Sequence, residues 1–196
     1  MDNYFLYLHG YQSSPTTLRA LKLQLWLREH YPDSRIDAPR LADRNALEAF
    51  GTINALLDDI VSKRKVIIGA SLGGLMAHLL KQLRDDITDV ILINPALHFD
   101  AVLANMGLAV GSEKEGEVSQ EDINIIRSFM PKEILNQEDY LLLLQQDDEV
   151  CPYLWSVDLL PNSHIDIQNG QGHPYKEIEK AFDAMSKFLD RPVTPN

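Results

Sequence analysis

The sequence is short of several residue types, and each shortage excludes a class of protein. It contains one cysteine, Cys151, in 196 residues. No disulfide can form within the chain, so we expect a reduced protein of the cytoplasm. The 18 basic residues are outnumbered by 29 acidic ones, which gives a formal charge of −11. A surface of this sign disfavours phosphate backbones and anionic headgroups, so we expect neither a nucleic-acid partner nor a membrane partner.

Long apolar runs and processing signals are missing as well. The longest apolar runs, such as residues 140–144, are far shorter than the roughly 20 residues that a membrane-spanning helix needs. The first residues carry neither a basic leader nor an apolar stretch, so no signal peptide is expected. Apolar residues make up 45% of the chain, which is enough for a core. The length is typical of one domain, and we expect a single folded unit over residues 1–196.

Short apolar runs alternate with helical patterns along nearly the whole chain. The runs are continuously apolar, which is typical of strands buried on both faces of a parallel sheet. This pattern predicts a doubly wound α/β fold with a mainly parallel sheet of about six strands. The predicted strands are 4–10, 34–41, 65–71, 88–97, 139–146 and 164–168. The predicted helices are 13–31, 45–63, 72–85, 121–130, 152–160 and 175–189.

One interval, residues 99–138, breaks this alternation because it contains no strand pattern. It consists of a Gly- and acid-rich piece, "GLAVGSEKEGEVSQED", and a short helical piece, "EDINIIRSFM". A segment this long between neighbouring strands is usually functional or mobile. It therefore reads either as a lid-like insertion over a site or as a plain surface insertion.

The strongest motif is Gly-Ala-Ser-Leu-Gly at residues 69–73, which matches G-x-S-x-G between a strand and a helix. That is the setting of the nucleophile elbow of α/β-hydrolases. A serine in such a turn projects its hydroxyl above the sheet edge, and the flanking residues lie too close to neighbouring backbone for side chains. Ser71 is therefore the candidate nucleophile, and the Leu72 N–H at the start of the helix is a candidate oxyanion donor. The alternative is a Gly-rich turn with an incidental serine.

A serine hydroxyl needs a base, and His173 is the best placed of the six histidines. It lies in the Gly-rich "NGQGHPY" between the last strand and the last helix. That position is the carboxyl edge of a parallel sheet, where Ser71 also lies. The acidic residues that follow the preceding strand supply a carboxylate to orient the imidazole. Asp148 is our choice for this role, and Asp147 is the alternative.

The loop after the first strand, "HGYQSSP", should supply the second oxyanion donor. Gly10 allows close approach, and the Tyr11 N–H is the candidate donor. We expect His9 to hold this loop by hydrogen bonding and residues 12–14 to cap the following helix.

Together these segments resemble the small bacterial YqiA-like esterase family, a compact branch of the α/β-hydrolases. The resemblance rests on "YLHGYQSSP", "GASLGG", "INPA", "DDEV" and "GHPY", in this order over nearly the whole chain. It implies ester substrates, with a nucleophile, triad acid, base and two backbone oxyanion donors at Ser71, Asp148, His173, Tyr11 and Leu72. The family usually has glycine where this chain has Asp147, and often an acidic residue where it has Gly172.

The sequence therefore predicts a serine hydrolase that cleaves a small acyl ester or thioester through an acyl-serine intermediate. No zinc ligand set, dinucleotide loop or phosphate loop is recognisable, so we expect no cofactor and no metal. A thioesterase or amidase on the same scaffold is one alternative. A hydrolase-like binding protein without activity, and a flavodoxin-like binding domain, are others. The oligomeric state stays open.

Overall fold

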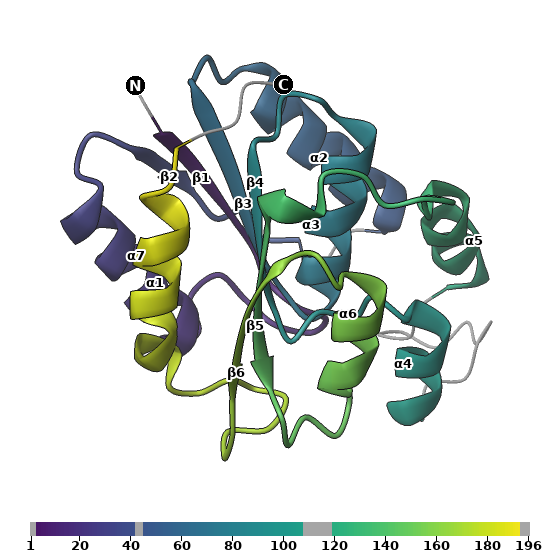
Figure 1. The fold of residues 1–196 in the computed structure, drawn as a ribbon. Helices are drawn as coiled ribbons and strands as arrows, with labels where there is room; N and C mark the ends of the chain where they lie inside the picture. The colour runs from purple at the N-terminus through teal and green to yellow at the C-terminus, as the bar shows by residue number, and fades with distance from the viewer. Residues whose placement is uncertain (1–2, 42–44, 108–118, 193–196) are drawn as a thin grey trace.

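A six-stranded, fully parallel sheet lies at the centre of the computed structural model, which describes residues 3–41, 45–107 and 119–192 (Figure 1). The strand order is β2-β1-β3-β4-β5-β6, and every neighbouring pair is parallel. The strands are β1 (Asn3–Leu8), β2 (Arg35–Asp37), β3 (Arg64–Ala70), β4 (Asp89–Ile93), β5 (Tyr140–Gln145) and β6 (His164–Gln168). The predicted doubly wound sheet of about six strands is confirmed.

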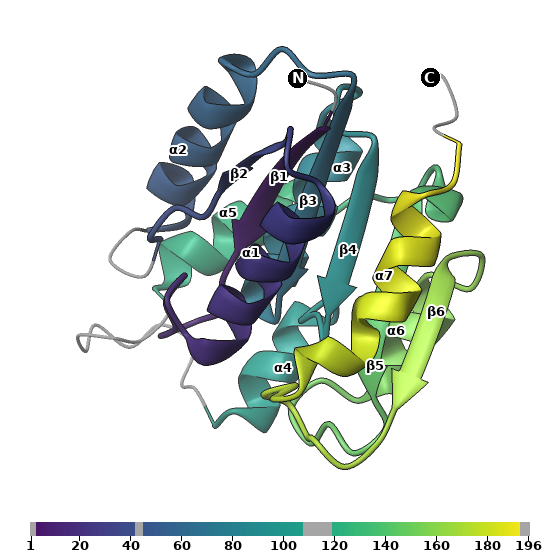
Figure 2. The same cartoon turned by 90° about the vertical axis from the view of Figure 1, so that its left-hand side faces the viewer.

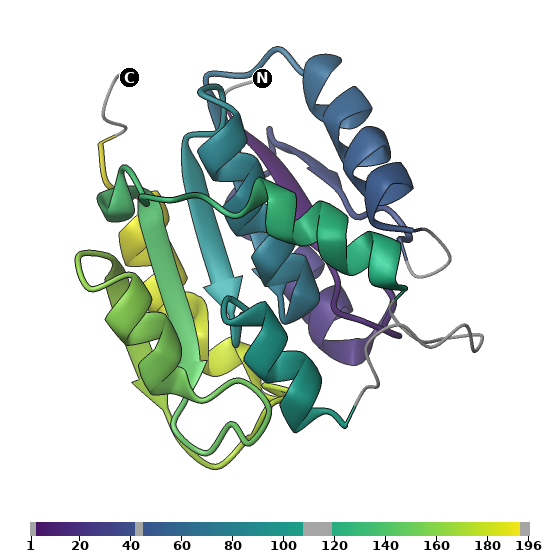
Figure 3. The same cartoon turned by 90° about the vertical axis from the view of Figure 1, so that its right-hand side faces the viewer.

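Helices cover both faces of this sheet, which explains the continuously apolar strands. Alternate side chains of β1 enter two different cores: Leu6 and Leu8 pack on one face, and Phe5 and Tyr7 on the other. The helices are α1 (Leu18–His30), α2 (Ala46–Asp58), α3 (Leu72–Leu83), α4 (Phe99–Asn105), α5 (Gln120–Phe129), α6 (Tyr153–Leu159) and α7 (Phe182–Leu189). Helices α1 and α7 cover one face (Figure 2), and the other helices cover the opposite face (Figure 3).

Three local predictions are wrong in detail. The second strand has only three residues, Arg35–Asp37, at the edge of the sheet. The first helix is capped not by residues 12–14 but by Thr17, whose hydroxyl accepts the Ala20 N–H at 3.4 Å. The last helix does not start at Tyr175, because that residue has φ of 47°. A 3-10 turn, η2 (Ile178–Ala181), precedes α7.

Two helices occupy the described part of the interval 99–138, and they lie in different places. Helix α4 lies at the end of the sheet to which the arrowheads of β4 and β6 point (Figure 2). Helix α5 packs against α2, where the rings of Phe50 and Phe129 are 5.0 Å apart. Most of the Gly- and acid-rich piece, residues 108–118, lies outside the described residues. None of the helices in the described ranges is long and apolar enough to cross a membrane.

A network of buried charges lies at the amino ends of the central strands. The Arg64 guanidinium, at the start of β3, contacts the Asp89 carboxylate, at the start of β4, at 2.5 Å. Arg191, which follows α7, contacts the other oxygen of Asp89 at 2.6 Å. Lys81 of α3 pairs with Asp139, directly before β5, at 2.7 Å. These pairs tie the two helices α3 and α7 to the sheet at the edge opposite the G-x-S-x-G turn.

Candidate active site

The G-x-S-x-G turn has a strained backbone at its centre, between β3 and α3. Ser71 has φ of 53° and ψ of −119°, a conformation that costs free energy for a residue other than glycine. The expected close approach of the flanking glycines is present. A Cβ on Gly69 would lie 2.3 Å from the Gly73 carbonyl oxygen, and a Cβ on Gly73 would lie 2.2 Å from the Leu8 oxygen. Larger residues at either position would push the turn away from the sheet.

Hydrogen bonds on both sides of Ser71 hold this conformation. Its N–H donates to the Ile93 carbonyl, at the end of β4, at 3.0 Å. Its carbonyl accepts the N–H groups of Gly74 and Leu75, in the first turn of α3, and of Ala96. The serine is thus fixed to the neighbouring strand and to its own helix, so its hydroxyl has a defined position at the sheet edge.

The structure brings three of the predicted residues into one chain of hydrogen bonds. Nε2 of His173 lies 3.0 Å from the Ser71 Oγ, and its Nδ1 lies 2.9 Å and 3.0 Å from the two carboxylate oxygens of Asp148. An ionised carboxylate only accepts hydrogen bonds, so Nδ1 carries the proton. Nε2 then presents its lone pair to the serine hydroxyl, which is the tautomer that a general base requires.

Asp148 itself is held from behind by backbone groups. Its side chain is fully buried, and its Oδ1 accepts the N–H groups of Val150 at 2.9 Å and Cys151 at 2.7 Å. The carboxylate therefore faces the imidazole in a fixed orientation. Of the two acids that the sequence left open, Asp148 is the one that contacts the histidine ring.

The other two acids of the cluster hold the backbone of the same loop. Asp147 accepts the N–H of Gly170 at 2.9 Å on one oxygen and that of Gly172 at 3.1 Å on the other. Desolvation raises the pKa of Asp147, but these backbone donors outweigh it and the net pKa is lowered. Glu149 accepts the N–H of His173 at 3.4 Å. All three carboxylates that follow β5 thus act on the loop that carries the histidine.

Asn94, which follows β4 directly, is a site residue that the sequence analysis missed. It is 2% exposed. Its side-chain nitrogen donates to the carbonyls of Gly172 at 3.1 Å and His173 at 3.0 Å, and its oxygen accepts the Gln145 N–H at 2.8 Å. The available signal was a polar residue at the end of an apolar strand, within the "INPA" segment.

The loop after β1 lies directly against the serine. A Cβ on Gly10 would be 3.1 Å from the Ser71 Cβ, which is tighter than an ordinary contact, so a larger residue here would press on the serine. His9 holds the loop as expected: its Nε2 accepts the Leu41 N–H at 3.0 Å, and its Nδ1 lies 2.9 Å from the Gly10 carbonyl oxygen. The same ring therefore ties this loop to the segment after β2.

A small, mainly apolar cavity opens beside the serine. Its lining brings the two predicted oxyanion donors and the serine together with one face of α4. The lining residues are Tyr11, Ser71, Leu72, Ala96, Phe99, Val102, Leu103 and Met106. Its volume of about 20 Å³ is close to that of one water molecule. Helix α4 thus forms the wall of whatever space an acyl group would enter.

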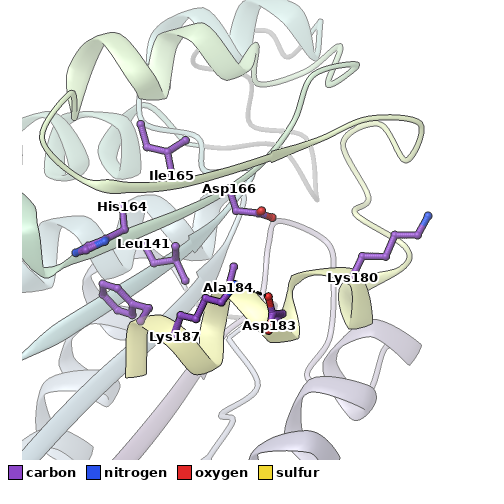
Figure 4. A pocket seen from close by; sticks show the side chains of 9 residues that line it. Leu141, His164, Ile165, Asp166, Lys180, Asp183, Ala184 and Lys187 are labelled. Carbon is purple, nitrogen blue, oxygen red and sulfur yellow. Dashed lines mark hydrogen bonds and ion pairs between the residues drawn. The ribbon is translucent and has the colours of Figure 1, made fainter. Parts of the chain in front are cut away.

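A larger hollow of about 310 Å³ lies elsewhere, between the edge strand β6 and helix α7 (Figure 4). It is lined by Leu141, His164, Ile165, Asp166, Lys180, Asp183, Ala184, Lys187 and Phe188. Two of these side chains, Asp183 and Lys187, pair with each other at 2.7 Å. The hollow contains none of the residues Ser71, Asp148 and His173, so its larger size does not make it the reaction site.

Cys151 lies close enough to the acid and the base to raise the question of a metal site. Ligand atoms of Asp148, Cys151 and His173 all lie within 4.8 Å of one another. The imidazole and the carboxylate are already hydrogen-bonded to each other, and a metal ion would have to displace that bond. Burial, and then the charges of Asp148 and Glu149, raise the pKa of the Cys151 thiol. A protonated, buried thiol is a poor ligand, and we interpret Cys151 as a packing residue.

The chain matches the Uncharacterised protein family (UPF0227) over residues 4–190. It is also similar to solved structures of α/β-hydrolases at low sequence identity. Est1E from Butyrivibrio proteoclasticus has a TM-score of 0.72 and 18% identity, over 97% of this chain and 89% of that one. Alpha/beta hydrolase domain-containing protein 10 from mouse has a TM-score of 0.70 and 15% identity, over 95% of this chain and 89% of that one.

The Pyrococcus furiosus esterase Pf2001 has a TM-score of 0.66 and 18% identity, over 97% of this chain and 83% of that one. At this low sequence identity, the structural similarity shows the fold alone. The predicted α/β-hydrolase fold is confirmed. The match over residues 4–190 also confirms the resemblance given by the motifs. The chain belongs to the Uncharacterised protein family (UPF0227), which is the YqiA-like family that the motifs resemble.

Proposed function

We propose that this protein is a serine hydrolase that cleaves carboxylic esters through an acyl-Ser71 intermediate. The observation that carries the proposal is the series of contacts from Ser71 through His173 to Asp148, at 3.0 Å and 2.9 Å, beside an apolar cavity. The strained serine turn and the buried, oriented carboxylate support it, because neither is needed for the fold alone.

In the proposed reaction, the Ser71 Oγ attacks the acyl carbonyl while Nε2 of His173 takes its proton. Asp148 stabilises the imidazolium that forms. The backbone N–H groups of Tyr11 and Leu72 bind the developing oxyanion, at about 3 kcal/mol for each donor. The tetrahedral intermediate expels the alcohol, which His173 protonates. Water then attacks the acyl-serine with His173 as the base, which releases the acid and restores the serine.

The cavity supports a first choice of acyl group. Its walls at Phe99, Val102 and Leu103 are apolar, and the volume of about 20 Å³ leaves little room. A short, uncharged acyl group fits such a space best, so we propose short-chain esters as the first substrates to assay. Activity should fall with each added methylene unless α4 moves.

A fluorophosphonate probe tests the proposal, because it labels a serine only when a base activates the hydroxyl. The expected result is one covalent adduct, located on Ser71 by peptide mass spectrometry and lost in Ser71→Ala. Matched esters, thioesters and amides of one acyl group then separate an esterase from a thioesterase or an amidase. Absence of labelling and of turnover in the folded protein would overturn the proposal in favour of a hydrolase-like protein without activity.

A further inference from the structure

From its contacts we infer that Asn94 is a positioning residue that holds the loop of His173 against the strand beside Ser71. The inference rests on the proposed function, since positioning matters only if His173 is the base. It concerns a residue that touches neither the serine hydroxyl nor the imidazole and acts through the backbone of the histidine loop.

The side chain of Asn94 uses its hydrogen-bonding groups on two separate segments. Both bonds from its nitrogen go to consecutive carbonyls of the histidine loop, those of Gly172 and His173. Its oxygen accepts the N–H of Gln145, the last residue of β5. The buried amide therefore joins the ends of β4 and β5 to the loop that follows β6, and a simple turn residue would make no such connection.

The backbone of Asn94 lies one residue from the bond that fixes the nucleophile. The Ile93 carbonyl accepts the Ser71 N–H at 3.0 Å, and the Asn94 N–H donates to Leu143 at 3.0 Å. Asn94 also has φ of 41°, in the left-handed region that asparagine adopts more often than other residues except glycine. The conformation still costs some free energy, and the surrounding hydrogen bonds hold it. One residue thus connects the position of the serine with that of the histidine.

The histidine loop needs this support because its own backbone is permissive. Gly170 and Gly172 have φ of 94° and 57°, and glycine leaves the chain many alternatives when its neighbours do not restrain it. The imidazole side chain is 20% exposed, so solvent is available for a displaced ring. Removing two of the bonds that fix Gly172 and His173 should let the ring move out of reach of the Ser71 Oγ.

Two substitutions test this role, and a second asparagine provides a matched control. Asn94→Asp keeps the shape and the acceptor oxygen but replaces both N–H donors by an oxygen that faces two carbonyls. Asn94→Gly removes the side chain and the backbone strain together. Asn136 also has positive φ, 52°, but it is exposed and precedes β5 at the opposite edge, so Asn136→Gly makes the same backbone change away from the site.

We expect both Asn94 variants to lower kcat and the fluorophosphonate labelling rate in the same proportion, by about 10- to 100-fold, since a displacement of about 1 Å can have an effect of that size. KM for a short ester should change little, because the cavity is untouched. In proton NMR we expect a low-field signal of the His173 Nδ1–H in the wild type, and this signal should broaden or vanish in both variants. Asn136→Gly should leave all three measurements at the wild-type values.

Wild-type rates and an intact low-field signal in Asn94→Asp, with Ser71 of the wild type labelled, would overturn the inference and leave the proposed function standing. Absence of labelling in the wild type would instead remove the proposed function. Thermal unfolding is recorded for each variant. Should Asn94→Gly not fold, Asn94→Asp decides the question, and Asn94→Ser replaces it should the charge prevent folding.

Discussion

The two edges of the sheet use buried aspartates in different ways. At the amino edge, Asp89 lies between two guanidinium groups, at 2.5 Å and 2.6 Å. At the carboxyl edge, Asp148 accepts two backbone N–H groups and one imidazole. The first carboxylate is neutralised by full positive charges. The second keeps its charge available for an imidazolium that would form only during the proposed reaction.

The backbone conformation also differs between the two edges. Of the five described residues other than glycine with positive φ, four lie at the carboxyl edge, Gln12, Ser71, Asn94 and Tyr175, and one, Asn136, lies at the amino edge. The amino edge is fixed by ion pairs between regular elements. Backbone strain lowers stability and a single hydrogen bond adds only modestly to it, but both set positions, whereas breaking a buried ion pair is strongly destabilising. Changes at the carboxyl edge should therefore affect rate, and changes at the amino edge should affect the free energy of unfolding.

The largest effect should come from Ser71→Ala. Without the nucleophile, kcat for a short ester should fall by at least about 10⁴-fold, while the free energy of unfolding should stay within about 1 kcal/mol of the wild type. The change in the free energy of unfolding should be small because the alanine adopts the same strained backbone and the substitution removes only one contact, that of the hydroxyl. Ester turnover and urea denaturation measure the two quantities. Substantial remaining hydrolysis would assign the reaction to another residue.

Asp148→Asn should have the next largest effect, on the order of 10³- to 10⁴-fold in kcat, because the amide can hold the imidazole in the wrong tautomer. The substitution keeps the shape and the oxygen that accepts the Val150 and Cys151 N–H groups. The measurement is kcat for the same ester, with the fluorophosphonate labelling rate beside it. A larger loss in Asp147→Asn than in Asp148→Asn would assign the role of triad acid to Asp147.

The sequence predicted correctly those residues of the carboxyl edge whose position follows from chain order in a parallel sheet. A serine after β3, acids after β5 and a histidine after β6 must share one edge, and the structure brings them within hydrogen-bonding distance. Asn94 was missed because a polar residue between a strand and a proline is typical of a turn. Its role appears only when the loop after β6 folds back onto the end of β4, which no local pattern encodes.

The surface of α1 shows a second limit of sequence patterns. A helix over residues 13–31 was predicted from apolar residues at helical spacing, Leu18, Leu21, Leu25 and the neighbouring Trp26. The helix is present over Leu18–His30, but the three leucines are 69%, 49% and 56% exposed, and of the four only Trp26 is buried. The buried face carries Leu23 and Leu27 instead. Two apolar sets are interleaved in this helix, and only packing against the sheet selects one of them.

Asp89→Asn should give the largest loss of stability, about 3–5 kcal/mol, because it leaves the buried Arg64 without its counter-charge and takes an ion-pair partner from the partly buried Arg191. Urea denaturation at neutral pH measures the loss, and kcat below the unfolding temperature should stay at the wild-type value. Asp183→Asn, in an exposed pair with Lys187, is the control and should show no measurable change. A fall in kcat as large as that of Asp148→Asn would contradict the separation of the two edges.

Acid should act on the free energy of unfolding through a buried histidine, His78. Stability should fall because burial lowers the pKa of His78 to about 4. The unfolded chain then binds the extra proton between about pH 6.5 and 4, so folding loses about 3 kcal/mol over that range as the pH falls.

His78→Asn tests whether His78 causes the loss of stability in acid. Its amide can replace Nδ1, which lies 3.1 Å from the Tyr140 hydroxyl. The variant should lose the dependence of the unfolding free energy on pH between about 6.5 and 4. Urea denaturation at a series of pH values measures this. An unchanged dependence in the variant would assign the acid loss of stability to other groups.

Asp147→Asn should have the smallest effect at the carboxyl edge, about a threefold decrease in kcat, because the amide keeps one of the two side-chain oxygens that accept backbone N–H groups. The pKa of Asp147 is lowered in the folded protein, so its charged form persists down to the acid range and this decrease should not depend on pH between about 5 and 8. Asp147→Gly removes both of these oxygens and should lower kcat further. Equal rates for glycine and aspartate would mean that Asn94 and Glu149 suffice to hold the loop.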